Sequence, residues 1–214
     1  IHRIFILKMR SFTHVLLLLF SLYVIYSIKL YVLLIYLPSV ILWVFLSNLQ
    51  AIPSMVLKIM LFPFVITAAV TLGYFAMLKS GEGDEKYALD NLGRTAQITA
   101  YDIRYYTGRT AGSGYSIGEL DGTFGSMISL APQAINVTLF RPYLWEVNNP
   151  LMLMSSLESF ALLTLSIYIV FGHFAKLTSA ITHPDVFFAL FFSICFAFAV
   201  GVSTFNFGTL VRYK

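Results

Sequence analysis

The sequence predicts an all-α fold, a polytopic helical membrane protein with about five transmembrane helices and one external, partly interfacial loop domain. One observation is composition: 58% of the 214 residues are hydrophobic and 11% are charged, whereas a soluble domain carries about 25% charged residues. The other is the length of the apolar runs, which reach the roughly 20 residues that a helix needs to cross a bilayer. The mean hydropathy of +0.81 agrees with both.

The charged residues are unevenly placed along the chain. Residues 79–150 hold 6 basic and 8 acidic residues, and the remainder holds 8 basic and 2 acidic residues. No basic face gathers in the polar part, which argues against a nucleic-acid binder. The pattern predicts three domains: three transmembrane helices in 1–78, an external loop domain in 79–154, and two transmembrane helices in 155–214.

The first apolar stretch, residues 12–49, is about twice the length of one span. It predicts two helices, near 12–28 and 30–49, that turn at "YSIKLY". A single long tilted helix and a re-entrant pair are the alternatives. A third span, near 55–77, is predicted after the break at "SNLQAIPSM".

The polar segment is predicted to fold against the membrane surface. Apolar residues at helical spacing predict an amphipathic helix over roughly 84–106, and six glycines in the stretch that follows it predict a loop. Residues 124–145 are apolar but broken by Pro132 and Pro142. They predict short helices that lie in the membrane interface rather than crossing it.

The fourth span has two candidate starts. Asn149 as the cap, with Pro150 at the first helical position, gives a span of about 23 residues. A capping box from Ser155 to Glu158 leaves about 17 residues. The first start places Glu158 two turns inside the helix, where an acid in a membrane is functional by default. The second makes Glu158 a structural cap.

The fifth span is predicted to begin at "THPD", residues 182–185, and to run to about Phe205. With five spans, five basic residues of the short loops fall on one side of the membrane and three on the other. The positive-inside rule then places the amino end inside and residues 79–154 outside. Neither end resembles a natural terminus, so we expect this chain to be part of a longer polytopic protein.

Residues 139–150, "LFRPYLWEVNNP", contain the main candidate site. Tyr143 and Trp145 have amphipathic rings that favour the headgroup layer, and Arg141 and Glu146 could pair with each other or with lipid phosphate. On this interpretation the segment is a membrane-surface anchor. The alternative is the wall of a reaction site, with Arg141 as a phosphate clamp and Glu146 as a general acid or base.

The other ionisable candidates are a group of acids and arginines in the predicted amphipathic helix and just after it. They are Asp84, Glu85, Asp102, Arg104 and Arg109. A solvated helix face explains them, and proton transfer by Asp102 is the alternative. The four histidines include no pair at i, i+4 spacing, and "GSGYSIG" lacks the spacing and the preceding strand of a nucleotide-binding loop. The sequence therefore predicts no cofactor and no metal.

Two stretches, "APQAINVTLFRPYLWEVNNPLMLMSSLES" and "NFGTLVRYK", resemble polytopic inner-membrane proteins encoded in bacterial surface-polysaccharide gene neighbourhoods. The terminal "VRYK" also resembles the arginine–tyrosine motif that occurs late in type-C glycosyltransferases and related polymerases. The resemblance covers about residues 80–214 and implies that Arg212 faces a lipid-linked diphosphate. The acidic motif of such enzymes has no equivalent before Gly81, so catalysis would require residues that precede this chain.

We therefore expect a membrane component of cell-envelope glycan assembly at the outer face of the bacterial inner membrane. Its candidate reaction is the transfer or polymerisation of a lipid-linked sugar. The predicted site residues are two arginines for the diphosphate, two aromatic residues for the substrate and two acids for the proton. They are Arg141 and Arg212, Tyr143 and Trp145, and Glu146 and Asp102, respectively.

The alternative function is a non-enzymatic scaffold or accessory subunit of a larger envelope complex, such as a secretion or motility machine. The expected partners are membrane lipid, a lipid-linked sugar and other membrane protein chains, without nucleic acid. A glycan-assembly component would lose product when its loop arginines are replaced, whereas a scaffold would change the proteins that copurify with it.

Overall fold

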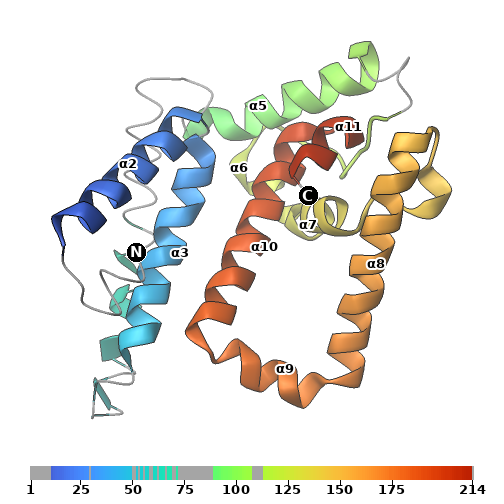
Figure 1. Cartoon of the computed structure of the whole chain (residues 1–214). Coiled ribbons are helices and arrows are strands. Elements are labelled where there is room, and N and C mark those ends of the chain that lie inside the picture. Colours follow the sequence, from blue (N-terminus) through green and yellow to red (C-terminus); the bar gives the residue numbers. More distant parts are fainter. Residues whose placement is uncertain are drawn as a thin grey trace. The chain divides into compact units, whose positions relative to one another are not determined.

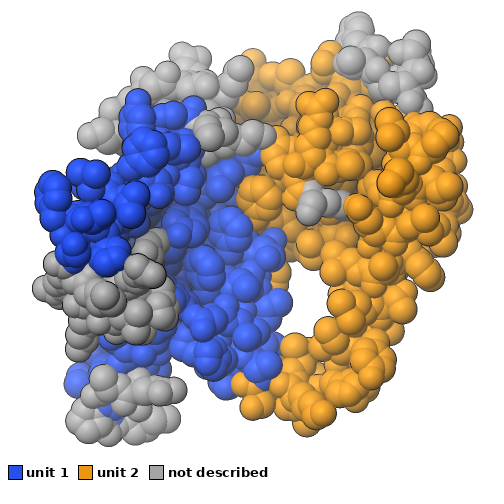
Figure 2. Space-filling view, viewed as in Figure 1, with its two compact units in different colours: residues 1–80, 180–193 blue, residues 81–179, 194–214 orange. Residues whose placement is uncertain are grey.

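The computed structural model describes residues 11–28, 30–49, 89–107 and 113–213, with short pieces between 52 and 71. Within these ranges the regular elements are helical, apart from one isolated antiparallel bridge between Gly114 and Asn206 (Figure 1). The chain groups into two compact units (Figure 2). Unit 1 comprises Ile1–Ser80 and Ala180–Ser193, and unit 2 comprises Gly81–Ser179 and Ile194–Lys214.

Unit 1 contains α2 (Phe12–Ile28), α3 (Leu30–Leu49) and the first half of α10 (Pro184–Thr204). α2 and α3 are separate helices with the predicted bounds. Aromatic rings and one polar contact join α3 to α10. The Tyr36 ring meets the edges of Phe188 and Phe192, with centroids 6.1 Å apart in both pairs. The indole Nε1 of Trp43 donates to Asp185 at 2.7 Å.

Unit 2 contains the other described helices. In chain order they are α5 (Leu89–Asp102), the π-helical η2 (Ile103–Thr107), α6 (Phe124–Ser129), α7 (Ala131–Phe140), the 3-10 turn η3 (Leu144–Glu146), α8 (Pro150–Gly172), most of α9 (Phe174–Ile181), the second half of α10, α11 (Phe207–Leu210) and the 3-10 turn η4 (Val211–Tyr213).

Three of the described helices are long and apolar enough to cross a membrane: Tyr31–Leu49 of α3, α8 and α10. The apolar part of α2, Phe12–Ser27, is shorter. A 23-residue helix such as α8, with apolar side chains exposed along most of its length, is suited to lipid and not to water. The chain is thus a helical membrane protein. Most of the predicted third span, residues 55–77, lies outside the described residues, and the total of five spans stays a prediction.

The start of α8 distinguishes between the two predicted helix starts. The Asn149 side chain accepts a hydrogen bond from the backbone N–H of Met152 at 2.8 Å, and Pro150 is the first helical residue. The helix is therefore 23 residues long. The start at the capping box of Ser155 is wrong, because Ser155 lies inside the helix, and Glu158 lies two turns in.

The core of unit 2 forms where α7 crosses the second half of α10. Ala134 and Val200 are completely buried there, and a Cβ atom on Gly201 would collide with the backbone of Ala134. The hydroxyl of Thr138 donates to the backbone oxygen of Ala197 at 2.7 Å. A glycine and an alanine thus let two helices approach closely, in the way that small residues do in membrane helix packing.

The short helices predicted in 124–145 are present as α6, α7 and η3. α6 begins at a local cap, because the side chain of Thr123 accepts a hydrogen bond from the Ser126 N–H at 3.1 Å. Asp121 in turn accepts from the Thr123 N–H at 2.8 Å and from its hydroxyl at 2.6 Å. The predicted amphipathic helix is described from Leu89, and its depth in the membrane interface stays a prediction, as does that of the short helices.

Candidate functional site

The loop at residues 113–120 is fastened to the carboxyl end of α10. The Tyr115 N–H donates to the Phe205 oxygen at 3.0 Å, and the Phe207 N–H donates to the Ser113 oxygen at 2.8 Å. The Tyr115 hydroxyl also lies 2.6 Å from the hydroxyl of Thr204. Backbone pairing and one buried ring therefore hold this loop against the end of an apolar helix.

A pocket of about 550 Å³ lies between this loop and the helix formed by α5 and η2. Its floor is formed by the buried side chains of Tyr115, Leu120 and Phe205. Exposed polar and aromatic residues form its rim; they are Tyr101, Arg104, Tyr105, Ser116 and Glu119. Its volume is within the range of small-molecule sites, which is roughly 300–1,000 Å³.

Contacts among the rim residues fix the positions of several of them. The rings of Tyr101 and Tyr105 lie with centroids 4.5 Å apart, and the Arg104 guanidinium lies 5.5 Å from the Tyr105 ring centroid, in cation–π geometry. Across the pocket, the side-chain amide of Gln97 donates to the Leu120 oxygen at 2.8 Å and ties the loop to α5. Two phenol rings, a cation and an acid therefore surround one opening.

The backbone is irregular on both sides of the pocket. η2 is a π-helical turn, and π-turns inside helices occur frequently at functional sites. Phe205 has a positive φ of 47°, which costs energy for a residue with a bulky side chain. Phe205 follows the last residue of α10, so the same geometry also ends that helix.

Burial raises the pKa of the Tyr115 phenol, and this effect exceeds the opposing influence of its hydrogen bonds to Thr204 and Phe205 and of the Arg141 charge. Tyr115 therefore remains protonated at neutral pH. Its hydroxyl is hydrogen-bonded to the Thr204 hydroxyl and to the backbone oxygen of Gly201 in α10, and it is unsuited to act as a base.

The predicted site in "LFRPYLWEVNNP" forms a closed ion pair, which we call the clasp and define as Arg141, Tyr143 and Glu146. The Arg141 Nε–H donates to both carboxylate oxygens of Glu146, at 3.1 and 3.0 Å, and a terminal guanidinium nitrogen donates to Oε1. The Tyr143 N–H donates to the other oxygen at 2.8 Å. The two charged side chains are 19% and 21% exposed.

The clasp packs on α11 and on α8. The Arg141 guanidinium lies 5.3 Å from the ring centroid of Phe207. The backbone oxygen of Arg141 accepts a hydrogen bond from Ser159 at 3.2 Å. The clasp therefore joins η3 to α8 and α11, and its geometry is that of a structural ion pair.

Partial burial would raise the pKa of Glu146, but the hydrogen bonds from Arg141 and Tyr143 and the charge of Arg141 outweigh burial, so that its pKa lies below the ordinary value. A carboxyl held ionised in this way is a poor general acid, since a general acid needs a raised pKa. The catalytic role of Glu146 stays a prediction that this geometry does not favour.

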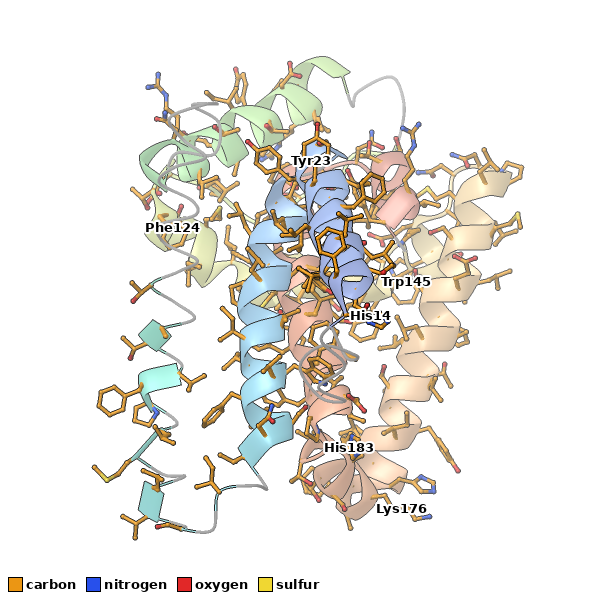
Figure 3. All side chains as sticks on the ribbon, turned by 60° about the vertical axis from the view of Figure 1, so that its left-hand side comes forward. His14, Tyr23, Phe124, Trp145, Lys176 and His183 are labelled. Atoms are coloured by element: carbon orange, nitrogen blue, oxygen red, sulfur yellow. The ribbon has the colours of Figure 1, made fainter. Side chains whose placement is uncertain are left out.

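Trp145 is exposed beside the clasp. Its ring stacks on Tyr143 with centroids 4.7 Å apart, and 80% of its surface is exposed. η3, which contains Trp145 (labelled in Figure 3), contacts α8. An exposed indole beside an apolar helix is typical of the membrane interface.

The structure thus brings four predicted site residues together, namely Arg141, Tyr143, Trp145 and Glu146. It does not add the other two to the clasp: Asp102 is exposed at the end of α5, and Arg212 is exposed in η4. Of the remaining ionisable candidates, Arg104 lines the pocket. Asp84, Glu85 and Arg109 lie outside the described residues.

Sequence reasoning missed the pocket, because its residues come from segments that are far apart in the chain. Gln97, Tyr115 and Glu119 had no shared pattern that would have linked them. The only sequence signal was a helix with aromatic residues at one spacing, followed by a glycine-rich loop. Within the described residues, no group of three or more histidine, cysteine, aspartate or glutamate side chains could hold a metal ion.

Comparisons with protein-family models, with curated proteins and with solved structures find no match to this chain.

Proposed function

We propose that this chain is a membrane component of cell-envelope glycan assembly and that its pocket holds the polar headgroup of a lipid-linked sugar. The observation that carries the proposal is the position of the pocket. Phe205, in its floor, directly follows Thr204, the last residue of the apolar helix α10. A helix of 21 residues is about 32 Å long, close to the thickness of the hydrocarbon layer. The pocket would therefore open at headgroup depth.

The chemistry of the lining suits a phosphorylated sugar. The faces of Tyr101 and Tyr105 offer apolar surface for the C–H groups of a sugar ring, while Gln97, Ser116 and Glu119 offer hydrogen-bonding groups. Arg104 carries a charge that is compatible with a phosphate oxygen. A pocket with an apolar floor and a few convergent polar groups is the usual form of a small-molecule site.

The topology that we propose has five spans, with residues 79–154 at the outer face of the bacterial inner membrane. In support, the start of α8 and the end of α10 lie together in unit 2, because α7 packs on α8 and is bonded to α10 through Thr138. Two apolar helices thus have their ends at the same polar region. The sequence resemblance to surface-polysaccharide membrane proteins supports a location in the bacterial inner membrane.

In this proposal the pocket binds and presents the sugar, and the clasp keeps the pocket's surroundings rigid. Because Glu146 is engaged with Arg141, the described residues favour holding the substrate over transferring it. Tyr143 and Trp145 position the region at the membrane surface, and Arg212 and Asp102 remain exposed groups for a substrate or a partner that reaches beyond the pocket.

The proposal is tested by photocrosslinking in lipid nanodiscs. The probe is a short-chain polyprenyl diphosphate sugar with a diazirine, and the comparison probe is the same polyprenyl diphosphate without the sugar. We expect the double variant Y101A/Y105A to lose about tenfold in affinity for the sugar-bearing probe, since two aromatic contacts of about 0.7 kcal/mol each amount to 1.4 kcal/mol. Arg104→Gln should weaken binding of both probes.

The matched control is Tyr168→Ala, which removes an exposed tyrosine from α8 and should leave labelling unchanged. Equal labelling of the wild type and the double variant by the sugar-bearing probe would contradict the proposal, provided that both proteins have the same thermal unfolding midpoint.

A second function, a non-enzymatic accessory subunit of a larger envelope complex, is favoured by one further observation. The part of α8 beyond Ser159 has no buried residue, although it is strongly apolar. An interface with another membrane chain would use such a face.

A further inference from the structure

α9 connects two long apolar helices and follows the first of them almost without a loop. A single residue, His173, separates it from α8, and the backbone oxygen of His173 accepts a hydrogen bond from the Leu177 N–H at 2.9 Å. Two residues, Thr182 and His183, separate α9 from α10. Figure 1 shows that α9 turns sharply away from the axis of α8. The connection between the two apolar helices is therefore itself a short helix.

The ionisable side chains of this part of the chain gather at the connection. Residues 159–172 and 186–204 contain no charged side chain, whereas residues 173–185 contain Lys176, Asp185 and two histidines. Lys176 and Asp185 are exposed. Charged groups are expensive in the hydrocarbon layer of a membrane. The uncharged stretches of α8 and α10 are therefore suited to lie in that layer, with the connection at a boundary between membrane and water.

α9 has an apolar face and a polar face. Phe174, Leu177 and Ile181 follow the i, i+3, i+7 spacing that places side chains on one side of a helix. Phe174 is 63% exposed, and no residue of α9 is buried. Lys176 and Ser179, which are exposed, lie two positions after Phe174 and Leu177 and thus about 200° around the helix from them. An uncovered apolar face opposite a lysine is typical of a helix that lies in a membrane surface.

The end of α8 that leads into α9 also has exposed rings. Phe171 is 83% exposed and Tyr168 is 61% exposed, and the Tyr168 ring lies with its centroid 4.8 Å from that of His173. Tyrosine and histidine rings combine an apolar body with a polar tip, which suits the layer between acyl chains and headgroups. Lipid is therefore the surroundings that fit both the end of α8 and the apolar face of α9.

We propose that α9 lies flat in the membrane surface and binds a leaflet that contains anionic lipid. Phe174, Leu177 and Ile181 enter the boundary of the acyl chains, and Lys176 lies on the water side, where its ammonium group contacts lipid phosphate. The helix would thereby limit how far α8 and α10 slide across the bilayer. The inference requires that α8 and α10 enter the membrane, and it does not depend on the pocket or on its ligand.

The position of α9 is tested by spin labelling of the full chain in vesicles of phosphatidylcholine and phosphatidylglycerol. Cys195→Ser removes the native thiol, and a nitroxide is attached to Leu177→Cys or, as the matched variant, to Ser179→Cys. We expect the label of Leu177→Cys to collide mainly with oxygen, which concentrates in lipid, and that of Ser179→Cys to collide mainly with a water-soluble nickel chelate. Labels at each position from 174 to 181 should give oxygen access with the helical period, so the loss of one variant through misfolding does not hide the pattern.

The preference for anionic lipid is tested with two photoactivatable lipids, phosphatidylglycerol and phosphatidylcholine with identical acyl chains. Labelling of residues 173–185 is quantified by mass spectrometry of peptides. We expect about fivefold more labelling by phosphatidylglycerol, the ratio that about 1 kcal/mol per lysine gives, and Lys176→Gln should bring the ratio close to one. The matched control is Ser179→Gln, which changes an exposed residue of the same helix without changing its charge and should keep the preference.

Three results would overturn the proposal. Access of the nickel chelate to both labels would mean that the whole of α9 lies in water. Protection of both labels from oxygen and from the chelate would mean that protein covers the helix. Equal labelling of the wild type by the two photoactivatable lipids would mean that Lys176 does not select lipid charge. Each of these results leaves binding of the sugar-bearing probe in the pocket unchanged, so the two proposals can fail separately.

Discussion

The clasp and the pocket contain the same kinds of residue but differ in how those residues are used. Arg141 lies against aromatic rings and is bonded to Glu146, with about a fifth of each charged side chain exposed. Arg104 also lies against a tyrosine ring, but it is exposed, and Glu119 is exposed across the same opening. The charged side chains of the clasp are paired with each other, whereas those of the pocket are exposed to solvent.

The difference shows that residue type alone does not identify a binding site. In the clasp, each charge finds its partner five residues away, and the pair then packs on α8 and α11. In the pocket, the charged groups come from η2 and from a loop held by α10, and their separation leaves a cavity. Burial and pairing, rather than composition, distinguish a structural ion pair from a candidate recognition site.

The largest expected effect comes from breaking the clasp. Glu146→Ala leaves the Arg141 guanidinium partly buried without its carboxylate, so we expect the free energy of unfolding in detergent to fall by about 2–3 kcal/mol. Chemical denaturation followed by circular dichroism measures this change. The control is Arg104→Met in the pocket, which should change stability by less than about 0.5 kcal/mol. A similar loss of unfolding free energy in both variants would mean that the clasp and the pocket arginine contribute equally to stability.

A smaller effect follows from pH. Because the folded state holds the pKa of Glu146 below its ordinary value, the ionised carboxylate stabilises the fold at pH values above the unfolded pKa. This contribution is lost as the pH falls through the lowered, folded value. The stability difference between the wild type and Glu146→Gln should therefore be constant near neutrality and disappear in acid. A difference that persists at the lowest accessible pH would show that the carboxylate is not the source of stability.

The smallest effect concerns the cap of α6. Hydrogen bonds from Ser126 and Thr123 lower the pKa of Asp121 to about 2, so its carboxylate should stay ionised and keep the cap through mild acid. Titration of the Asp121 carboxyl carbon by NMR should give a midpoint near this value, and Thr123→Ala should raise it toward 3.8, the ordinary value. A wild-type midpoint near 3.8 would mean that these hydrogen bonds are absent in solution.

The helical membrane class and several helix bounds could be predicted because they depend on local signals. Long apolar runs indicate α3, α8 and α10, and Asn149 with Pro150 provides a cap and a first residue that fix the start of α8. The pairing of Arg141 with Glu146 was one of two interpretations of a short segment, so this contact could also be predicted from residues close in sequence. These features involve residues close in sequence.

The pocket could not be predicted because it depends on tertiary structure. Its floor combines Tyr115 with Phe205, which meet through backbone bonds between a loop and the end of α10. No periodicity links these positions. The position of Glu158 within α8 could be narrowed to two alternatives, because two capping patterns competed. Only the observed helix start distinguishes between them.

Because the 113–120 loop is hydrogen-bonded to the carboxyl end of α10, the shape of the pocket should depend on the thickness of the membrane. A helix that crosses a bilayer adjusts its tilt when the hydrocarbon thickness changes, and the backbone bonds from Tyr115 and Ser113 would carry that rotation directly to one wall of the cavity. A change in membrane thickness would then change the width of the opening. The acyl-chain length of the lipids would therefore alter ligand affinity although the acyl chains do not contact the ligand.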